Sequence, residues 1–216
     1  MKYKLILSIL LLNVISCKSQ IKKEEIIIKQ NDVMEHFDKK NYDDLMKNPQ
    51  FASYGYYLNS NGDKIQVYTN SGGKGFIKRI KNHNSPYINI NSFYENGNLQ
   101  LIGLQFYVFQ VGISKEFDET GKLTKETNHD LPYKFSIDDL REKIKNEYKV
   151  DIVSDYSDID PTLMIVNRWE GFPNDIGIYK KGVPMYQVKL TTKDGTINLE
   201  VNALTGETIT KKVNGK

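Results

Sequence analysis

The chain has 216 residues, one cysteine and a formal net charge of +3, from 30 lysines and arginines against 27 aspartates and glutamates. A single cysteine excludes an intramolecular disulfide, a disulfide scaffold and a cysteine-rich zinc site. The small net charge argues against nucleic-acid binding, and the 39% hydrophobic content is enough for a packed core. The length predicts one domain or two small ones.

The first 16 residues have the pattern of a signal peptide. Lys2 and Lys4 form a positive start, and the apolar run that follows, residues 5–12, is too short to span a bilayer, which needs about 20 residues. This run leads to Val14-Ile15-Ser16-Cys17, which resembles a bacterial lipobox. The resemblance implies cleavage before Cys17 and acylation of that residue, so that residues 1–16 are removed. An ordinary signal peptide with an incidental cysteine is the alternative.

The residues after Cys17 bear on the location of the mature protein. Without Lys2 and Lys4 the formal charge falls from +3 to +1. Lys18 follows Cys17 in place of the aspartate that resembles an inner-membrane retention signal, which favours the outer membrane. The cluster Lys22-Lys23-Glu24-Glu25 is loosely similar to surface-export signals of Bacteroidota lipoproteins. Residues 17–30 are therefore expected to form a lipidated tether that joins the protein to a membrane.

Residues 31–130 are predicted to hold a helix followed by an antiparallel β-meander. Apolar residues on one face predict a helix over residues 31–47, with Asn41 as the cap of a second short helix that Pro49 stops. Beyond it, β-branched and aromatic residues alternate with polar ones between glycine turns. The predicted strands cover residues 54–58, 64–68, 75–80, 87–90, 92–94, 99–102, 104–109, 113–117 and 122–124.

Part of the meander has a weak internal repeat of an aromatic residue, polar residues, a glycine turn and an aliphatic residue. The clearest copies are residues 93–99 and 117–123. They resemble the MORN-like repeats of bacterial antitoxin components, whose units are hairpins. Any meander of hairpins puts glycine at turns and aromatics in strands, so a plain meander is an equal alternative.

Residues 131–216 are predicted to form a helix and a second antiparallel sheet. Ser136 is a good N-cap for a helix over residues 136–148. The strands predicted after it cover residues 151–153, 163–166, 185–191, 196–201 and 207–209. The end of the chain, with Asp194-Gly195 and residues 199–207, resembles a PepSY-type domain, although Asn202 stands where that family has aspartate. The resemblance implies a secreted or envelope protein linked to the restraint of proteases.

The sequence has no recognised catalytic signature. It contains no H-E-x-x-H, G-x-S-x-G or P-loop motif, and His36, His83 and His129 stand alone. Asp151, Asp155, Asp158 and Asp160 are the best acidic cluster, but their spacing is not that of an EF-hand, so a solvated loop is expected. We therefore expect no catalytic residue, no cofactor and no metal site.

Residues 167–173 contain the best candidates for a binding site. Trp and Arg are typical hot-spot residues of interfaces, which singles out Arg168, Trp169 and Phe172. The alternative is that Trp169 and Phe172 close one end of the sheet as core residues, and it is favoured because large aromatic side chains are mostly buried.

Together these patterns predict an α+β fold and a non-catalytic, lipid-anchored envelope protein that binds or inhibits another protein, as an immunity protein or a protease-restraining module does. The alternatives are an envelope hydrolase with unrecognised carboxylates, and a structural or ligand-carrying lipoprotein. A binding protein should expose an apolar or aromatic patch without a deep polar cleft. An enzyme should have a concave pocket with two or more carboxylates or a His–acid pair.

Overall fold

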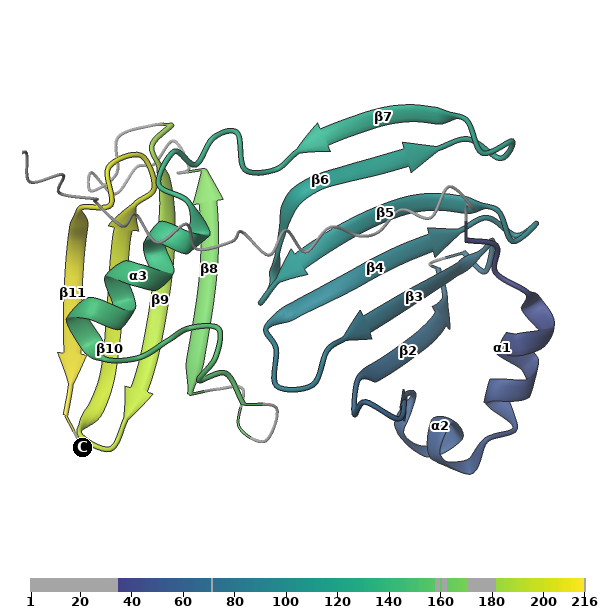
Figure 1. The fold of residues 1–216 in the computed structure, drawn as a ribbon, viewed down its shortest axis with the longest axis horizontal. Helices are drawn as coiled ribbons and strands as arrows, with labels where there is room; N and C mark the ends of the chain where they lie inside the picture. Colours follow the sequence, from purple (N-terminus) through teal and green to yellow (C-terminus); the bar gives the residue numbers. More distant parts are fainter. Residues whose placement is uncertain (1–34, 71, 158–159, 161–162, 171–181, 216) are drawn as a thin grey trace, which may run out of the picture. The chain divides into compact units, whose positions relative to one another are not determined.

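The computed structural model describes residues 35–70, 72–157, 160, 163–170 and 182–215, which hold three helices and two antiparallel sheets (Figure 1). Cys17 and the rest of the predicted signal peptide and tether lie outside the described residues. None of the described helices has the length and apolarity needed to cross a membrane.

Two short helices precede the first sheet. Helix α1, Lys39–Met46, begins after Asp38, whose side chain accepts a hydrogen bond from the Lys40 amide. Helix α2, Pro49–Tyr54, begins after Asn48, whose side chain accepts from the amides of residues 50 and 51. The prediction that Pro49 only stops a helix is therefore wrong. Proline is favoured at the first position of a helix because its missing N–H would have no partner there.

The first sheet is a seven-stranded meander in which each strand pairs with the next strand in the sequence, in the order β1-β2-β3-β4-β5-β6-β7. Its strands are β1 Tyr57–Leu58, β2 Lys64–Thr69, β3 Phe76–Lys81, β4 Tyr87–Phe93, β5 Leu99–Phe106, β6 Phe109–Phe117 and β7 Leu123–Asn128. The predicted meander is confirmed, although several predicted segments merge into longer strands. The strand predicted at residues 54–58 is reduced to two residues, because α2 extends to Tyr54.

One face of this sheet, at the end near the two helices, carries a hydrophobic core. It is built from buried residues of α2, of the strands and of the segment before α1: Phe37, Phe51, Ile65, Val67, Phe76, Phe93, Leu99 and Phe117. The ring of Phe37 lies 4.7 Å from that of Phe76 and 5.3 Å from that of Phe93, measured between centroids. The core thus fixes the parity of the strands, since Phe76 and Phe93 must point toward the helices.

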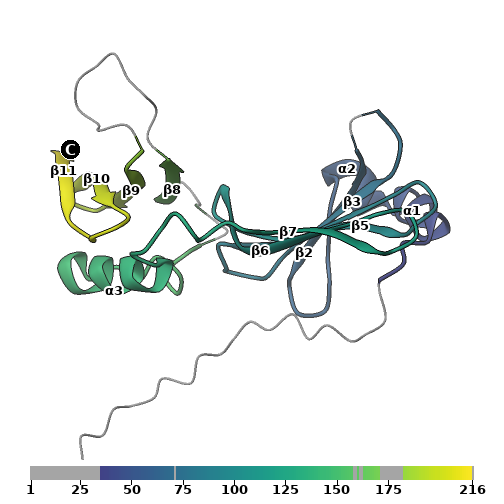
Figure 2. The same cartoon turned by 90° about the horizontal axis from the view of Figure 1, so that it is seen from above.

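The second sheet has four strands in the order β11-β10-β9-β8, and helix α3, Ile137–Tyr148, lies against one of its faces (Figure 2). Its strands are β8 Met164–Glu170, β9 Pro184–Thr192, β10 Gly195–Asn202 and β11 Thr208–Asn214. Ser136 caps α3 in a capping box with Asp139, which confirms the predicted start of the helix.

The second core lies between α3 and this sheet and extends to the first sheet. Leu140 and Ile144 of α3 pack with buried residues of β8, β9 and β10. Phe106 and Val111, from β5 and β6, belong to the same cluster. The two sheets therefore share a core at this end of the first sheet.

The fold is largely β, so the predicted α+β class with an N-terminal helix is confirmed only in part: the two antiparallel sheets are present, but helices are few. Strands hold many more of the described residues than the three helices do, and α1 has only 8 residues, none of them buried. The strand predicted at residues 151–153 is also absent, because the Asp151 carboxylate accepts hydrogen bonds from the amides of Val153 and Ser154 and bends the backbone into a turn.

Candidate functional site

Arg168 was predicted to bind a partner, but the structure places its side chain inside the protein, with 4% of it exposed. Its guanidinium bonds the Asp130 carboxylate at 2.6 Å and the His129 carbonyl at 2.9 Å, and it also donates to the Gln110 carbonyl. The ring of Tyr133 lies 4.2 Å from its central carbon. Since β8 carries Arg168 and the other groups belong to β6 and the segment after β7, this side chain joins the two sheets.

The other two predicted residues do not form a described patch with Arg168. Trp169 is half-buried, on the face of β8 opposite to that of Arg168. Phe172 lies outside the described residues. The guanidinium of Arg168 is occupied by groups of this chain, so the geometry favours a structural role for it.

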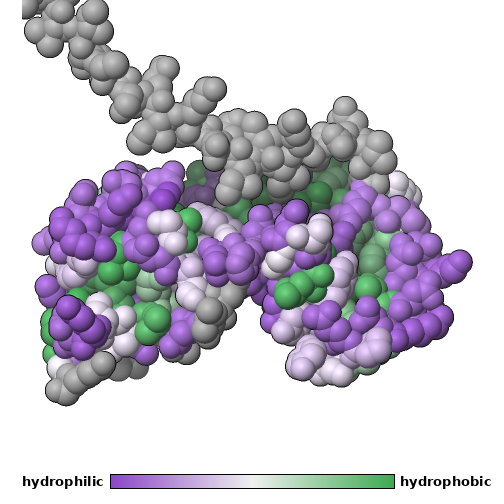
Figure 3. Space-filling view, turned by 60° about the horizontal axis from the view of Figure 1, so that its bottom comes forward, coloured by the Kyte–Doolittle hydropathy of each residue, from purple (hydrophilic) through white to green (hydrophobic). Residues whose placement is uncertain are grey.

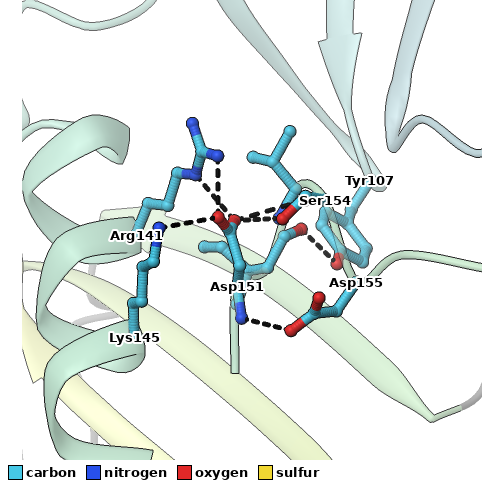
Figure 4. Close-up of polar contacts among 8 residues, drawn as sticks. Tyr107, Arg141, Lys145, Asp151, Ser154 and Asp155 are labelled. Atoms are coloured by element: carbon cyan, nitrogen blue, oxygen red, sulfur yellow. Dashed lines mark hydrogen bonds and ion pairs between the residues drawn. The ribbon is translucent and has the colours of Figure 1, made fainter. Parts of the chain in front are cut away.

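The acidic cluster predicted as a solvated loop is partly built into the fold (Figure 4). Arg141 binds both carboxylate oxygens of Asp151, at 2.6 and 2.7 Å, and Lys145 lies 3.5 Å away. The guanidinium hydrogen bonds hold the pKa of Asp151 well below its usual range. Asp155 accepts from the Asp151 amide, whereas Asp158 lies outside the described residues. Within the described segments, no group of three or more histidine, cysteine or acidic residues could hold a metal ion.

A hollow of about 470 Å³ between α1 and the first sheet gathers several carboxylates, the arrangement expected of an enzyme. Each carboxylate has another use, however. Glu35 accepts hydrogen bonds from Lys78 and Asn91, Asp38 caps α1, and Asp44 pairs with Lys47 at 2.8 Å. Their bonding supports local structure, and His36, which also lines the hollow, has its Nδ1 3.3 Å from the Asn98 side-chain oxygen.

A serine–histidine pair, not predicted from the sequence, lies near a second hollow of about 330 Å³ that is lined in part by His129 and Arg168. The buried Ser114 hydroxyl lies 2.9 Å from Nε2 of His129. Burial, with a smaller effect of the Arg168 charge, lowers the pKa of His129 and so favours a neutral ring. Among the described residues no carboxylate bonds its other nitrogen, because Asp130 binds Arg168 and the Gly112 amide. A complete catalytic triad is therefore not assembled in this part of the chain.

A third hollow, of about 420 Å³, lies on the second sheet and is lined by both polar and apolar residues. Its residues belong to all four strands and include Asn167, Gln187, Lys189 and Lys212. The polar lining residues alternate along their strands with buried apolar residues, such as Val188 and Leu199, which also reach the hollow. This is the ordinary pattern of an antiparallel sheet with one face toward solvent.

The first sheet differs from that pattern on the face that points away from its cores, which we call the open face. In β4, isoleucines alternate with asparagines, and such alternation predicts that the isoleucines face a core. The structure has the reverse parity. Asn89 and Asn91 share the face of Phe93, which is fully buried in the first core, whereas Ile88 and Ile90 point to the open face.

Strand pairing extends the aliphatic surface across three strands of the open face. Ile77 of β3 pairs with Ser92, and Ser92 pairs with Leu101 of β5, so both aliphatic side chains lie beside Ile90. Ile77, Ile88, Ile90 and Leu101 are half-buried and belong to neither hydrophobic core. Ile90 pairs with Gly103, which has no side chain and lies close to the Leu101 side chain. We call these four residues the aliphatic patch.

Basic and aromatic residues border the aliphatic patch. Lys64, Arg79 and Lys81 occupy the open face of β2 and β3, and Tyr68 pairs with Ile77 and is 40% exposed. On the face that Figure 3 shows, apolar residues reach the surface as islands within a hydrophilic surround. The parity reversal in β4 distinguishes the aliphatic patch, because a contiguous apolar surface bordered by polar residues is typical of an interaction site. We therefore take the open face as the candidate functional site.

Comparison with known proteins adds no family: no protein-family model, curated protein or solved structure matches the chain.

Proposed function

We propose that the chain is a non-catalytic, lipid-anchored protein of the bacterial cell envelope that binds another protein through the open face. The observation that carries this proposal is the orientation of Ile88 and Ile90, which places them outside both cores although the same strand offers asparagines for that role. Local patterns that conflict with the global fold are expected where function requires them. A flat aliphatic patch with a tyrosine and a basic border has the composition of a protein interface.

The anchor is the second part of the proposal. The lipobox-like residues before Cys17 and the basic residues at the start of the chain support acylation at Cys17 and an outer-membrane location. Cys17→Ser should release the protein from the membrane fraction, because several acyl chains are needed for stable anchoring. Membrane partitioning of Cys17→Ser equal to that of the wild type would overturn this part.

The family resemblances make the same proposal more specific. Hairpins β4–β5 and β6–β7 contain the two clearest copies of the repeat, which supports a MORN-like, antitoxin-type meander. Helix α3 followed by an antiparallel sheet, with the turn at residues 203–206 between its last two strands, supports a PepSY-like unit. On this basis an immunity protein or a protease-restraining module is the concrete form of the proposal.

The test is co-purification of the full chain, with Cys17 present, from cells that express it natively. Ile90→Asp places a charge in the aliphatic patch without changing either core. The matched control is Ile165→Asp. Ile165 lies on β8 of the second sheet, on the face that points away from α3, and is 37% exposed. We expect a specific protein that the wild type and Ile165→Asp retain and that Ile90→Asp loses. If no protein shows this dependence on residue 90, the proposal is wrong.

The competing candidate is an envelope hydrolase, and Ser114 with His129 is the pair that favours it. The Ser114 residue is 5% exposed, so an electrophile has little access to its oxygen. We expect a fluorophosphonate probe to leave the folded protein unlabelled. Labelling that disappears in Ser114→Ala would favour the hydrolase instead.

A further inference from the structure

Strand β7 ends the first sheet, and among the described strands it pairs only with β6 (Figure 1). The His129 amide, directly after β7, donates to the Gly112 carbonyl at 2.9 Å. Residues of an antiparallel pair alternate between bonding the neighbouring strand and pointing away from it. In the same register Lys125 and Thr127 bond β6, so the N–H and C=O of Glu126 point to the outer edge. Among the described residues, no group is hydrogen-bonded to them there.

The charged residues of β7 do not protect this edge. Edge strands are usually protected by charged side chains, which keep a strand of another protein away. Lys125 pairs with Glu116 at 3.0 Å, and Glu126 pairs with Lys115 at 3.2 Å. Both side chains of β7 are therefore drawn across β6, and their charges are compensated there.

Other outer strands lack this combination of length and compensated charge. β1, at the opposite end of the same sheet, has only two residues. β11, at one end of the second sheet, has seven residues, but its Lys211 and Lys212 have no acidic partner among the described residues. These lysines supply the repulsive charge that is compensated in β7.

The side chains of β7 are suited to an added strand. Leu123 is 44% exposed, and an apolar side chain of a neighbouring strand would cover it. Thr124 and Thr127 are β-branched, and such residues favour extended backbone. Backbone hydrogen bonds and burial of apolar surface would thus act together at this edge.

We infer that an extended strand of the protein partner pairs with β7 and continues the first sheet, while another part of the same partner covers the aliphatic patch. The inference rests on the proposed function and names the structure that the partner presents. The added strand would lie three strand spacings, about 14 Å, from β5. An interface of standard size, about 800 Å² per partner, extends roughly twice that distance, so one partner can contact both places.

A strand from a second copy of this chain is a poorer occupant. Two copies of β7 related by a two-fold axis would pair antiparallel, and the residue at the centre would face its own copy. In the registers that overlap most of β7, this residue is Lys125 or Glu126. Like charges would then lie directly opposite each other, which destabilises the pairing. The occupant is therefore a strand of a different protein.

The experiment compares two substitutions at position 126 in the full chain, purified from cells that express it natively. Glu126→Pro removes the outward N–H and keeps the bonds to β6, since an edge strand tolerates proline where its nitrogen faces solvent. The control, Glu126→Thr, removes the same carboxylate and keeps the N–H. We measure recovery of the protein that Ile90→Asp loses, called the Ile90-dependent protein. It should fall about tenfold in Glu126→Pro and less than about twofold in Glu126→Thr, because only proline removes a backbone hydrogen bond to the partner.

Hydrogen exchange of the wild type, with the recovered Ile90-dependent protein added, tests the same edge without a substitution. We expect slower exchange in peptides that cover residues 123–128 and no change in peptides that cover residues 208–214 of β11. Unchanged exchange at residues 123–128 would overturn the inference, whether or not Glu126→Pro folds.

The possible results separate the two claims. Equal recovery with proline and threonine at position 126 would overturn the inference and leave the proposed function standing. Absence of any Ile90-dependent protein would overturn both. Recovery of a differently tagged second copy of this chain, abolished by Glu126→Pro, would show that β7 pairs with itself and would also overturn the inference.

Discussion

At the scale of single residues, the ion pair of Asp151 and Arg141 makes a clear energetic prediction. The Asp151 side chain is 6% exposed and binds the guanidinium through both oxygens. Because its pKa is lowered in the folded state, the pair stabilises the protein above the unfolded pKa of about 3.9 and loses this effect as the pH falls further.

Asp151→Asn should therefore destabilise the protein by about 2 kcal/mol at pH 7, since it leaves Arg141 without its charged partner. The difference from the wild type should shrink as the pH is lowered from about 5 to 3, because the wild type then begins to lose the same interaction. Urea unfolding at pH 7, 5 and 3 measures it. A difference that grows toward pH 3 would show that the pKa is raised instead.

The positions of single residues also explain which parts of the site could be predicted from the sequence. Arg168 was selected because Arg and Trp are frequent in interfaces, but composition says nothing about which face of a strand a residue occupies. In the structure its neighbours Val166 and Tyr186 are fully buried on the same side of the sheet. The isoleucines of β4 were recognised as strand residues, yet their alternation predicts burial. Tyr87 and Phe93, at the two ends of the same strand, pack against the two cores and set the opposite parity.

At the scale of elements, local signals predicted most of the fold. Ser136 with Asp139, and glycines between β-branched runs, act through neighbouring residues and were therefore visible in the sequence. The errors arose where a polar side chain redirects the backbone. Asn48 makes Pro49 the start of a helix, and Asp151 turns an apparent strand into a turn.

The turn between β10 and β11 gives a prediction at this scale. Gly206 has a φ of +76°, and a Cβ at this position would lie 2.4 Å from the Phe135 ring. Gly206→Ala should lower the free energy of unfolding by about 2–4 kcal/mol, through backbone strain and displacement of Phe135.

The matched control is Gly55→Ala. Gly55 has a similar φ of +68°, but an added Cβ would have no neighbour within 4 Å. This variant should lose only about 1–2 kcal/mol, from backbone strain. Equal losses in the two variants would mean that Phe135 does not pack against Gly206 as the structure describes.

At the scale of the whole molecule, Arg168 ties the second sheet to the end of the first. Arg168→Met keeps much of the length but removes the charge, leaving the Asp130 carboxylate and the carbonyls of Gln110 and His129 without their donor. We expect a loss of about 2–4 kcal/mol in urea unfolding. Lys189→Met, on the face of β9 that points away from α3, should change stability by less than about 0.5 kcal/mol. An Arg168→Met variant as stable as this control would refute the role of Arg168.

The two sheets thus have different surfaces although their architecture is alike. The second sheet packs its apolar face on α3 and presents a polar face, and the first presents aliphatic side chains on the face away from its cores. Burial of apolar side chains against α3 alone accounts for the two different faces of the second sheet. For the first sheet we propose that a protein partner covers the aliphatic patch.

The most direct measurement is photo-crosslinking in living cells with a benzophenone amino acid placed at position 90 or, as the control, at position 165. Both positions carry isoleucines on outward sheet faces, one on each sheet, and position 165 is the more exposed. We expect position 90 to give a discrete adduct with one protein. We expect no adduct of the same mass from position 165. No adduct from position 90, or the same adduct from both positions, would contradict this prediction.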